Sequence, residues 1–190
     1  MRKNFGPNTY LYPQPVLIIG TYNEDGTANA MNVAWGGICG RPRLAINIGF
    51  GHQSSDNIKR AGAFTVHIAD EAHMEEADYF GLVSGRDEDK IVKAGMHAEK
   101  SEFVDAPVIT EFPIALECKV AEIQDAGGIM RVVGDIVNVS IDESVLGDDG
   151  MLDFDKLNAI SFDPMKHAYL KLGGKVGNAY SDGNKIKSNV

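Results

Sequence analysis

Residues 16–35 read VLIIGTYNEDGTANAMNVAW, and this stretch predicts two antiparallel strands joined by a tight turn. Residues 16–22 form an apolar run with many β-branched side chains, which favours a strand. Asp25-Gly26 follows, and this pair suits a hairpin bend because glycine adopts positive φ without strain. Along residues 27–35 the side chains alternate between two faces. The stretch therefore predicts a β-hairpin around which the rest of the chain is arranged.

The second strand of this hairpin has an unusual composition for a core strand. It carries three alanines, the carboxamides Asn29 and Asn32, and Trp35, the only tryptophan of the chain. Small side chains allow a close approach to the backbone, carboxamides donate and accept hydrogen bonds, and an indole offers a flat apolar wall. Together these features suit a planar heterocycle with a polar edge. The alternative is an ordinary hairpin in a barrel core, with Asn29 and Asn32 facing solvent.

The composition predicts one domain over residues 1–190, with an extended lead-in at 1–14 and a flexible tail at 181–190. The net charge of −9 argues against nucleic acid as a partner, because no basic face is apparent. The N-terminus has no apolar signal core, and no apolar run is long enough to cross a membrane. Cys39 and Cys118 form neither a zinc motif nor a redox pair. These observations predict a cytoplasmic protein with no membrane partner.

A second stretch of interest follows the strand predicted at residues 44–48. Gly49-Phe50-Gly51 ends that strand and leads to a helix over residues 54–61, for which a serine is the expected N-cap and Gly62 the expected stop. Free backbone amides at a helix start attract anions, and Ser54 and Ser55 add hydroxyl donors. The alternative is an ordinary capped helix with no ligand.

The remaining pattern predicts further strands at residues 63–68, 114–123 and 129–141, with a bulge at Gly134, and helices at 71–80 and 87–94. Gly36-Gly37 is expected to loosen the chain, and residues 159–190 are glycine-rich. Six or seven strands in antiparallel hairpins, without a βαβ rhythm, indicate a mainly β fold: a Greek-key-like antiparallel β-barrel with a few short helices.

The motifs of acid–base, nucleophilic and metal chemistry are absent from the sequence. The five histidines have no zinc-site spacing, and neither GxSxG, Walker A nor GxGxxG occurs. We therefore predict no catalytic side chain and no metal site. Such a chain is either a binding protein or a protein whose cofactor carries the reaction.

Several short motifs occur in the order found in one protein family. They are PVLIIGT at residues 15–21, DGTANAM at 25–31 with Ala34-Trp35, SSDNI at 54–58, Asp89-Lys90 and Leu116-Glu117-Cys118. In these motifs the chain resembles the flavin reductase-like, flavoredoxin-type proteins, which have the FMN-binding split-barrel fold. The resemblance covers about residues 10–180. Two departures are Asn32, where hydroxyl residues are frequent, and residues 127–131, where some flavoredoxins carry a histidine.

The resemblance implies a homodimer that binds one FMN per subunit near the interface. It places the phosphate near Ser54, Ser55 and Lys90, although Lys90 could also form a surface ion pair with its acidic neighbours. It places the flavin along the strand that ends at Trp35, with Phe162 stacking on the ring. The full set of candidate cofactor-binding residues is Asn29, Asn32, Val33, Ala34, Trp35, Asn47, Gly49, Ser54, Ser55, Asn57, Lys90 and Phe162.

The same resemblance implies an FMN-dependent oxidoreductase. Such an enzyme takes electrons from NAD(P)H and passes them to free flavin, ferric iron or a protein. The alternative is a flavoredoxin-like electron-transfer protein without an NAD(P)H site of its own, which receives electrons from a redox partner protein. A third possibility is a split-barrel binding module that has lost its flavin.

Overall fold

The computed structural model describes residues 1–187 and has mainly β structure. Twelve strands occur among these residues: β1 (Gln14–Pro15), β2 (Leu17–Tyr22), β3 (Ala28–Val33), β4 (Gly36–Gly40), β5 (Arg43–Gly49), β6 (Ala63–Ile68), β7 (Ala98–Lys100), β8 (Pro107–Ile109), β9 (Ile114–Asp125), β10 (Ile129–Ile141), β11 (Ile160–Asp163) and β12 (Ala168–Lys171). The helices are α1 (Gln53–Ala61), α2 (Met74–Leu82), α3 (Lys90–Lys93), η1 (Glu143–Val145), α4 (Phe154–Leu157) and α5 (Asn184–Lys187).

Seven strands form one antiparallel sheet in the order β3-β2-β6-β9-β10-β5-β4. Its two edge strands, β3 and β4, are consecutive in the chain, and only Ala34 and Trp35 join them. Because so short a link cannot span an open sheet of seven strands, the sheet must curl until its edges meet. The result is a barrel with a seam at Trp35, and the backbone N–H of Asn47 on β5 donates to the Trp35 carbonyl at 2.8 Å, which continues the β4–β5 pairing up to the seam.

The barrel interior is filled by side chains that alternate inward along the strands. The interior cluster is Leu17, Ile19, Val33, Leu44, Ile46, Ile48, Ile58, Phe64, Val66, Cys118, Met130 and Val132. Ile58 reaches this cluster from α1, which therefore closes one end of the barrel. The glycine at position 134 is required there, because a Cβ would lie 2.7 Å from the Phe64 ring.

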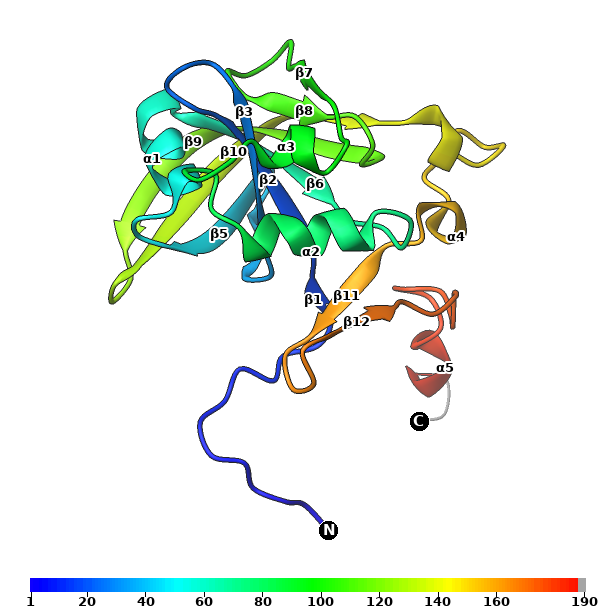
Figure 1. Cartoon of the computed structure of the whole chain (residues 1–190). Helices are drawn as coiled ribbons and strands as arrows, with labels where there is room; N and C mark the ends of the chain where they lie inside the picture. The colour runs from blue at the N-terminus through cyan, green and yellow to red at the C-terminus, as the bar shows by residue number, and fades with distance from the viewer. Residues whose placement is uncertain (188–190) are drawn as a thin grey trace.

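A second core covers the outer face of β2 and β3. In Figure 1, α2 and α3 lie in front of these strands, and the small sheet β1-β11-β12 lies below them. Ile18 and Ala30 from the barrel pack there against Phe80 and Ile91 from the two helices. Ala30 is fully buried in this cluster and is thus a packing residue. This outer layer brings α2 and α3 against the strand that carries the two carboxamides.

The structure confirms several elements expected from the sequence. The 16–35 hairpin is present as β2 and β3, α1 ends at Gly62 in the left-handed conformation, and β6, β9 and β10 lie where predicted. A register shift between Val133 and Gly134 in the β9–β10 pairing confirms the bulge. The sequence thus predicts the long strands of the barrel correctly.

Other expectations were wrong. The glycines after Trp35 belong to strand β4, and short strands occur at residues 98–100, 107–109, 160–163 and 168–171. The N-cap of α1 is His52 rather than a serine, and the predicted 87–94 helix shortens to Lys90–Lys93 behind an Asp89 cap. The carboxamides do not both face solvent, because Asn29 is buried and Asn32 is half-buried. These errors arise where pairing with distant strands or helices, and not local sequence preference, decides the conformation.

The two ends of the chain extend from this body. Residues 1–13 form an exposed arm whose N-terminal end lies away from the barrel in Figure 1, and Gln14, predicted as part of the lead-in, already pairs with Phe162. In the predicted tail, Asn184–Lys187 forms a helical turn, and residues 188–190 lie outside the described residues. Within residues 1–187, no helix has both the length and the apolar character to cross a bilayer.

Candidate functional site

Lys90 is a buried cation at the outer face of β3. Only 4% of the residue is exposed, and its Nζ donates to the carbonyls of Phe80 and Val83, both at 3.0 Å. These carbonyls end α2, where the negative end of the helix dipole favours a cation. No carboxylate among residues 1–187 pairs with Lys90. The neighbouring Glu88 pairs with Lys93 instead, so the surface ion pair considered for Lys90 is not formed.

Burial lowers the pKa of Lys90 from 10.5 to about 8. The cause is desolvation, because the ammonium has lost water and gained only neutral carbonyl acceptors. An ammonium has three N–H donors, and two of them are used in the described part of the chain. Lys90 therefore holds a charge without a counter-charge and a donor without an acceptor.

Lys90 faces a small polar cavity of about 50 Å³, which we call the Lys90 cavity. Roughly 10–15 Å³ of such accessible space holds one water molecule, so this cavity has room for a few water-sized groups, which is on the scale of a single oxyanion group and far smaller than a nucleotide. The cavity lies between β3, the start of α1 and the 80–85 turn. Its lining is Asn29, Met31, Asn32, His52, Gln53, Ser54, Phe80, Gly81, Val83, Ser84, Gly85 and Lys90.

Asn29 is the central polar residue between β3 and α1. Its amide nitrogen donates to the hydroxyls of Thr21 at 3.2 Å and of Ser54 at 2.9 Å, and all three residues are buried. Both amide hydrogens of Asn29 thus point to Thr21 and Ser54, and its side-chain oxygen points the opposite way, towards Gly85. Asn32 is fixed separately by a 2.8 Å bond from its amide to the Ala77 carbonyl of α2.

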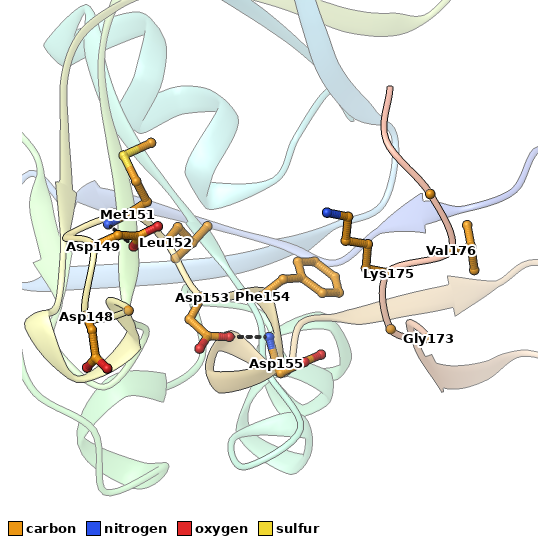
Figure 2. A pocket seen from close by; sticks show the side chains of 13 residues that line it. Asp148, Asp149, Met151, Leu152, Asp153, Phe154, Asp155, Gly173, Lys175 and Val176 are labelled. Carbon is orange, nitrogen blue, oxygen red and sulfur yellow. Dashed lines mark hydrogen bonds between the residues drawn. The ribbon is translucent and has the colours of Figure 1, made fainter. Parts of the chain in front are cut away.

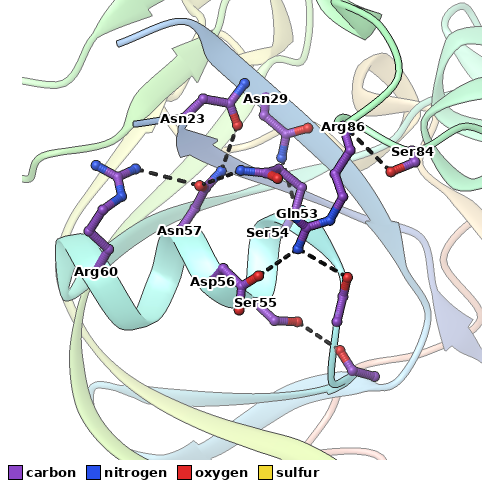
Figure 3. Close-up of polar contacts among 12 residues, drawn as sticks. Asn23, Asn29, Gln53, Ser54, Ser55, Asp56, Asn57, Arg60, Ser84 and Arg86 are labelled. Carbon is purple, nitrogen blue, oxygen red and sulfur yellow. Dashed lines mark hydrogen bonds and ion pairs between the residues drawn. The ribbon is translucent and has the colours of Figure 1, made fainter. Parts of the chain in front are cut away.

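The two serines at the start of α1 have different roles. Ser54 lines the Lys90 cavity, whereas Ser55 donates its hydroxyl to the Gly49 carbonyl at 2.7 Å and lies outside that lining. Asn57 donates to Thr21 at 3.1 Å and to Asn23 at 2.9 Å, and Figure 3 shows the bond to Asn23. Ser55 and Asn57 therefore anchor the helix to the loop and the hairpin, and Ser54 is the serine that the structure brings to Lys90.

A short loop closes the other side of the Lys90 cavity. Figure 3 shows Arg86 reaching from this loop to α1, where its guanidinium donates to Asp56 at 2.5 Å and to the Gly51 carbonyl at 3.2 Å. Gly85 lies so close to Asn29 that a Cβ would come within 2.0 Å of the Asn29 side-chain oxygen. Glycine is thus required at this position by a close approach.

Trp35 and Asn47 belong to a different cavity, at the seam of the barrel. This seam cavity has a volume of about 510 Å³, and its lining is Thr9, Leu11, Gln14, Trp35, Gly36, Gly37, Ile38, Cys39, Ala45, Asn47 and Arg131. The Asn47 side chain is held by a 3.4 Å contact to the Trp35 carbonyl. Strand β3 runs from the Lys90 cavity to this seam and so connects the two spaces.

The other candidate residues line neither cavity. Val33 packs in the barrel core, and Ala34 is half-buried in the two-residue link between β3 and β4. The Gly49 carbonyl accepts the hydrogen bond from the Ser55 hydroxyl. The ring of Phe162 packs beside Tyr169, with 6.2 Å between ring centroids, in the small sheet outside the barrel. The structure of one chain therefore gives no support for Phe162 stacking within either cavity.

A third hollow, larger than either, is a poor match for an anion. It lies between the 147–155 loop and the 173–177 segment and has a volume of about 800 Å³. Figure 2 shows Asp148, Asp149, Asp153 and Asp155 around it, with Lys175 as its one basic lining residue. A phosphate at this place would meet four carboxylates, which would repel it.

Sequence reasoning missed several residues of these sites. His52, Gln53, Ser84 and Gly85 line the Lys90 cavity, and Arg131 lines the seam cavity. The Ser84-Gly85 pair carried a weak signal, because a serine followed by a glycine often marks a turn or loop. Arg131 carried no local signal, since its place depends on the pairing of β10 with β5.

The family of the chain follows from a comparison with known domains. The family model described as "Flavin reductase like domain" matches residues 9–161. The chain belongs to the flavin reductase-like family. The match spans β1 to β11 and so includes both cavities.

Solved structures agree with this assignment. The flavoredoxin of Desulfovibrio vulgaris (Miyazaki F) is 36% identical, with a TM-score of 0.92 over 96% of this chain and 100% of that one. The flavoredoxin from Methanosarcina acetivorans is 27% identical, with a TM-score of 0.88 over 98% and 99%. Component B of nitrilotriacetate monooxygenase from Bacillus cereus is 21% identical, with a TM-score of 0.79 over 88% of each chain, and shares the fold. The fold is therefore the FMN-binding split barrel.

Flavin is the cofactor type associated with the flavin reductase-like family, and the residues of the Lys90 cavity fit its phosphate end. They provide a buried ammonium with a free donor, the Ser54 hydroxyl, and two carboxamides around a space the size of one oxyanion group. The acidic hollow offers no such donors. The fit thus rests on the donor set and on the missing counter-charge of Lys90.

Proposed function

We propose that the chain binds FMN, with the phosphate in the Lys90 cavity and the flavin along β3 towards Trp35. The observation that carries this proposal is the buried Lys90 ammonium, which has no counter-charge among the described residues. A phosphate monoester carries a charge of about −1.5 to −2 at pH 7 and would supply that counter-charge. The start of α1 adds backbone amides, whose dipole favours the same anion.

The size of the Lys90 cavity supports FMN over FAD. A cavity of about 50 Å³ with one buried ammonium suits the single terminal phosphate of FMN better than the diphosphate of FAD. Binding of FMN, riboflavin and FAD should be compared by calorimetry on the flavin-free chain. FMN should bind at least about tenfold more tightly than riboflavin, because only FMN carries the charged group. Equal affinity for FMN and riboflavin would contradict the placement of the phosphate.

When bound, the flavin supplies hydride and electron transfer, and the protein's part is to bind and orient it. Lys90 and Ser54 hold the phosphate end, and Asn29 fixes the Ser54 hydroxyl. Asn32 is held in place by α2 and presents its remaining polar edge to the cavity. Trp35 provides an apolar wall at the far end of the strand. No titratable side chain is needed for proton transfer in this arrangement.

We propose that the reaction is FMN-dependent oxidation of NAD(P)H, with free flavin, ferric iron or a protein as acceptor. The family assignment supports oxidoreductase chemistry. Steady-state oxidation of NADH and NADPH with added FMN tests the proposal. A chain that binds FMN yet oxidises neither nucleotide, and exchanges electrons only with a redox partner protein, would be an electron carrier. A chain without flavin affinity would be a binding module.

We also propose that the protein is a homodimer. Exposed apolar side chains support an interface between copies: Phe5, Tyr10, Leu11 and Tyr12 on the N-terminal arm, and Val137, Val139 and Ile141 along one face of β10. Light scattering should give twice the 20.5 kDa mass of one chain. A mass of one chain with FMN bound would refute the dimer.

We place the protein in the cytoplasm on the basis of its thiols. Cys39 is exposed, Cys118 is buried in the barrel, and both are free, which suits a reducing compartment. Cell fractionation with an antibody against the chain tests this location.

A further inference from the structure

Asn32 on β3 is held by an aspartate–tyrosine pair that lies outside the lining of the Lys90 cavity. The hydroxyl of Tyr169 on β12 donates to the Asp78 carboxylate on α2 at 2.7 Å, and the Asn32 amide nitrogen lies 3.4 Å from the same hydroxyl oxygen. The amide nitrogen also donates to the Ala77 carbonyl at 2.8 Å. Three elements far apart in the sequence, β3, α2 and β12, thus meet at one half-buried carboxamide.

The two acceptors around Asn32 determine which way its amide points. Burial and the hydrogen bond to Asp78 raise the pKa of Tyr169 to about 12, so the phenol keeps its hydrogen at neutral pH. That hydrogen is directed to Asp78, and the phenol therefore offers Asn32 only a lone pair. The Ala77 carbonyl also only accepts. An amide turned by about 180° would place its oxygen against two acceptors, so the NH2 group must face α2 and β12.

The Asp78 carboxylate is necessary for this selection. If the phenol hydrogen of Tyr169 were free, it could donate to an Asn32 oxygen turned towards it, and that bond would offset the loss of the bond to Ala77. Two neutral hydrogen bonds of this kind have similar net strength, so the amide would then occupy both orientations. Because Asp78 holds the phenol hydrogen, the second orientation gains nothing.

The fixed amide leaves Asn32 with its side-chain oxygen for the Lys90 cavity, which the residue lines. Within residues 1–187, no hydrogen bond ends on this oxygen. A carbonyl oxygen only accepts, so it does not bind a phosphate dianion, whose oxygens also only accept. It requires an O–H or N–H donor beside the anion that we place on Lys90. In FMN the donors nearest to the phosphate are the hydroxyls of the ribityl chain.

We propose that Asp78 and Tyr169 are positioning residues that keep the Asn32 carbonyl towards the cofactor, where it accepts a hydrogen bond from a ribityl hydroxyl. The inference rests on the proposed binding of FMN. It gives Lys90 and Asn32 different parts of one ligand, the phosphate and the ribityl chain. Tyr169 lies beyond residues 9–161, which the family model matches, so the pair connects the matched domain to a strand outside it.

Binding of FMN and riboflavin to the flavin-free chain separates these roles, because riboflavin has the ribityl chain without the phosphate. Tyr169→Phe and Asp78→Ala should each weaken both flavins by the same factor, at least about threefold, because Asn32 loses its fixed orientation. Asp78→Asn keeps a side-chain oxygen that accepts from the phenol and should restore most of the affinity. Lys90→Met, by contrast, should weaken FMN and leave riboflavin unchanged.

A double-mutant cycle shows whether the pair acts through Asn32. In an Asn32→Ala background, Tyr169→Phe should weaken neither flavin further, because no amide is left to orient. Tyr79→Phe is the matched control, since it removes the same hydroxyl group from a half-buried tyrosine of α2 that makes no hydrogen bond to Asn32. It should leave both affinities unchanged. NMR of the flavin-free chain adds a second readout, in which Tyr169→Phe should shift the side-chain NH2 signals that Asn32→Ala removes.

Several results would overturn the proposal while FMN binding itself stands. They are unchanged affinities in Tyr169→Phe, a loss confined to FMN, unshifted NH2 signals of Asn32, and an equal loss in the Asn32→Ala background. The last would mean that Tyr169 supports the packing of β12 on α2 and not the amide. A parent chain without affinity for either flavin would refute the proposed function and this role with it. Circular dichroism establishes that each variant is folded.

Discussion

Asn29 on β3 and Ser54 on α1 are joined by a 2.9 Å hydrogen bond from the Asn29 amide to the Ser54 hydroxyl. This bond holds the start of α1 against the second strand of the hairpin, beside Lys90. It also aims the Ser54 hydroxyl, since the bond uses one of its lone pairs and leaves its hydrogen free for an acceptor. The relationship makes Ser54 a test of the phosphate site and Ser55 its natural control.

Ser54→Ala should weaken FMN binding, whereas Ser55→Ala should not. Loss of a hydrogen bond to a charged group costs about 1.5–3 kcal/mol, so the Ser54 variant should bind FMN about tenfold or more weakly. Ser55 donates to the Gly49 carbonyl, and its loss should lower the free energy of unfolding by about 1 kcal/mol without changing FMN affinity. Calorimetry and urea denaturation measure both quantities. The reverse pattern would place the phosphate on the loop side of α1.

Lys90→Met should change cofactor binding and stability in opposite directions. FMN affinity should fall by about 2–3 kcal/mol, because a charged donor is lost. The flavin-free variant should be more stable than the parent at pH 7, because the desolvation that lowers the pKa of the ammonium to about 8 costs more than its two hydrogen bonds to the Phe80 and Val83 carbonyls contribute. Lys93→Met, which removes an exposed partner of Glu88, is the control and should do neither.

The pKa of Lys90 adds a pH signature to that prediction. It is about 8 in the folded chain, below the ordinary 10.5, so between these values the unfolded chain holds a proton that the folded chain has released. Stability rises with pH where the unfolded state binds more protons. The stability of the flavin-free parent should therefore approach that of Lys90→Met as pH rises above 8. If the difference in unfolding free energy between the two proteins does not change with pH, the lowered pKa of Lys90 is contradicted.

Gly85→Ala should damage the Lys90 cavity, and Gly173→Ala, outside that cavity, should not. The new methyl group at position 85 would lie 2.0 Å from the Asn29 oxygen, so either Asn29 or the loop must move. The corresponding atom at position 173 would meet no atom within 4 Å. We expect FMN affinity to fall at least about tenfold in the first variant only. Equal affinities would mean that the 83–86 loop moves aside without cost.

His67 should make the fold sensitive to mild acid. It is fully buried, and because the Ile109 N–H donates to its Nε2 at 2.9 Å, its proton must lie on Nδ1, which faces the Ile18 carbonyl at 3.1 Å. Burial lowers its pKa from 6.5 to about 4. Between these values the unfolded chain takes up a proton that the folded chain excludes, so stability is lost as pH falls from 6.5 to 4.

The size of this effect follows from the pKa difference and amounts to about 3 kcal/mol. Urea denaturation at several pH values should show a steeper loss of stability below pH 6.5 in the parent than in His67→Gln, which cannot titrate. Parallel curves for the two proteins would show that His67 is not the acid-sensitive group.

The sequence predicted the parts of the fold that local pattern determines. The 16–35 hairpin has a clear apolar run and a turn pair, and Gly62 is a clear helix stop, so both could be located. Strand β4 could not, because GGICG has little strand preference and becomes a strand by pairing with β5. The strands β11 and β12 were not predicted for the same reason, because each is short and forms by pairing with the other.

The candidate site was predicted with similar limits. The motifs indicated Asn29, Ser54 and Lys90 correctly as residues that lie together, although nothing in the charged sequence DEDK indicated that Lys90 is buried. Its burial results from the end of α2, which packs over it. Ser55, Asn57 and Phe162 were grouped with them on sequence alone, and the structure gives each of them another contact. Sequence identifies the residue types, and the packing of distant elements decides which of them meet.

The strand order of the barrel also has a consequence for synthesis. Strand β5, made early, must wait for β10, and β6 must wait for β9, before the sheet can close. As the chain leaves the ribosome, β5 and β6 therefore each keep one edge without its strand partner until β9 and β10, which ends at residue 141, have emerged. During that interval the nascent chain presents unpaired strand edges, the state most open to association with other chains and to capture by chaperones. Slow codons placed before the β9–β10 hairpin should lengthen this interval and lower the soluble yield, whereas slow codons after it should not.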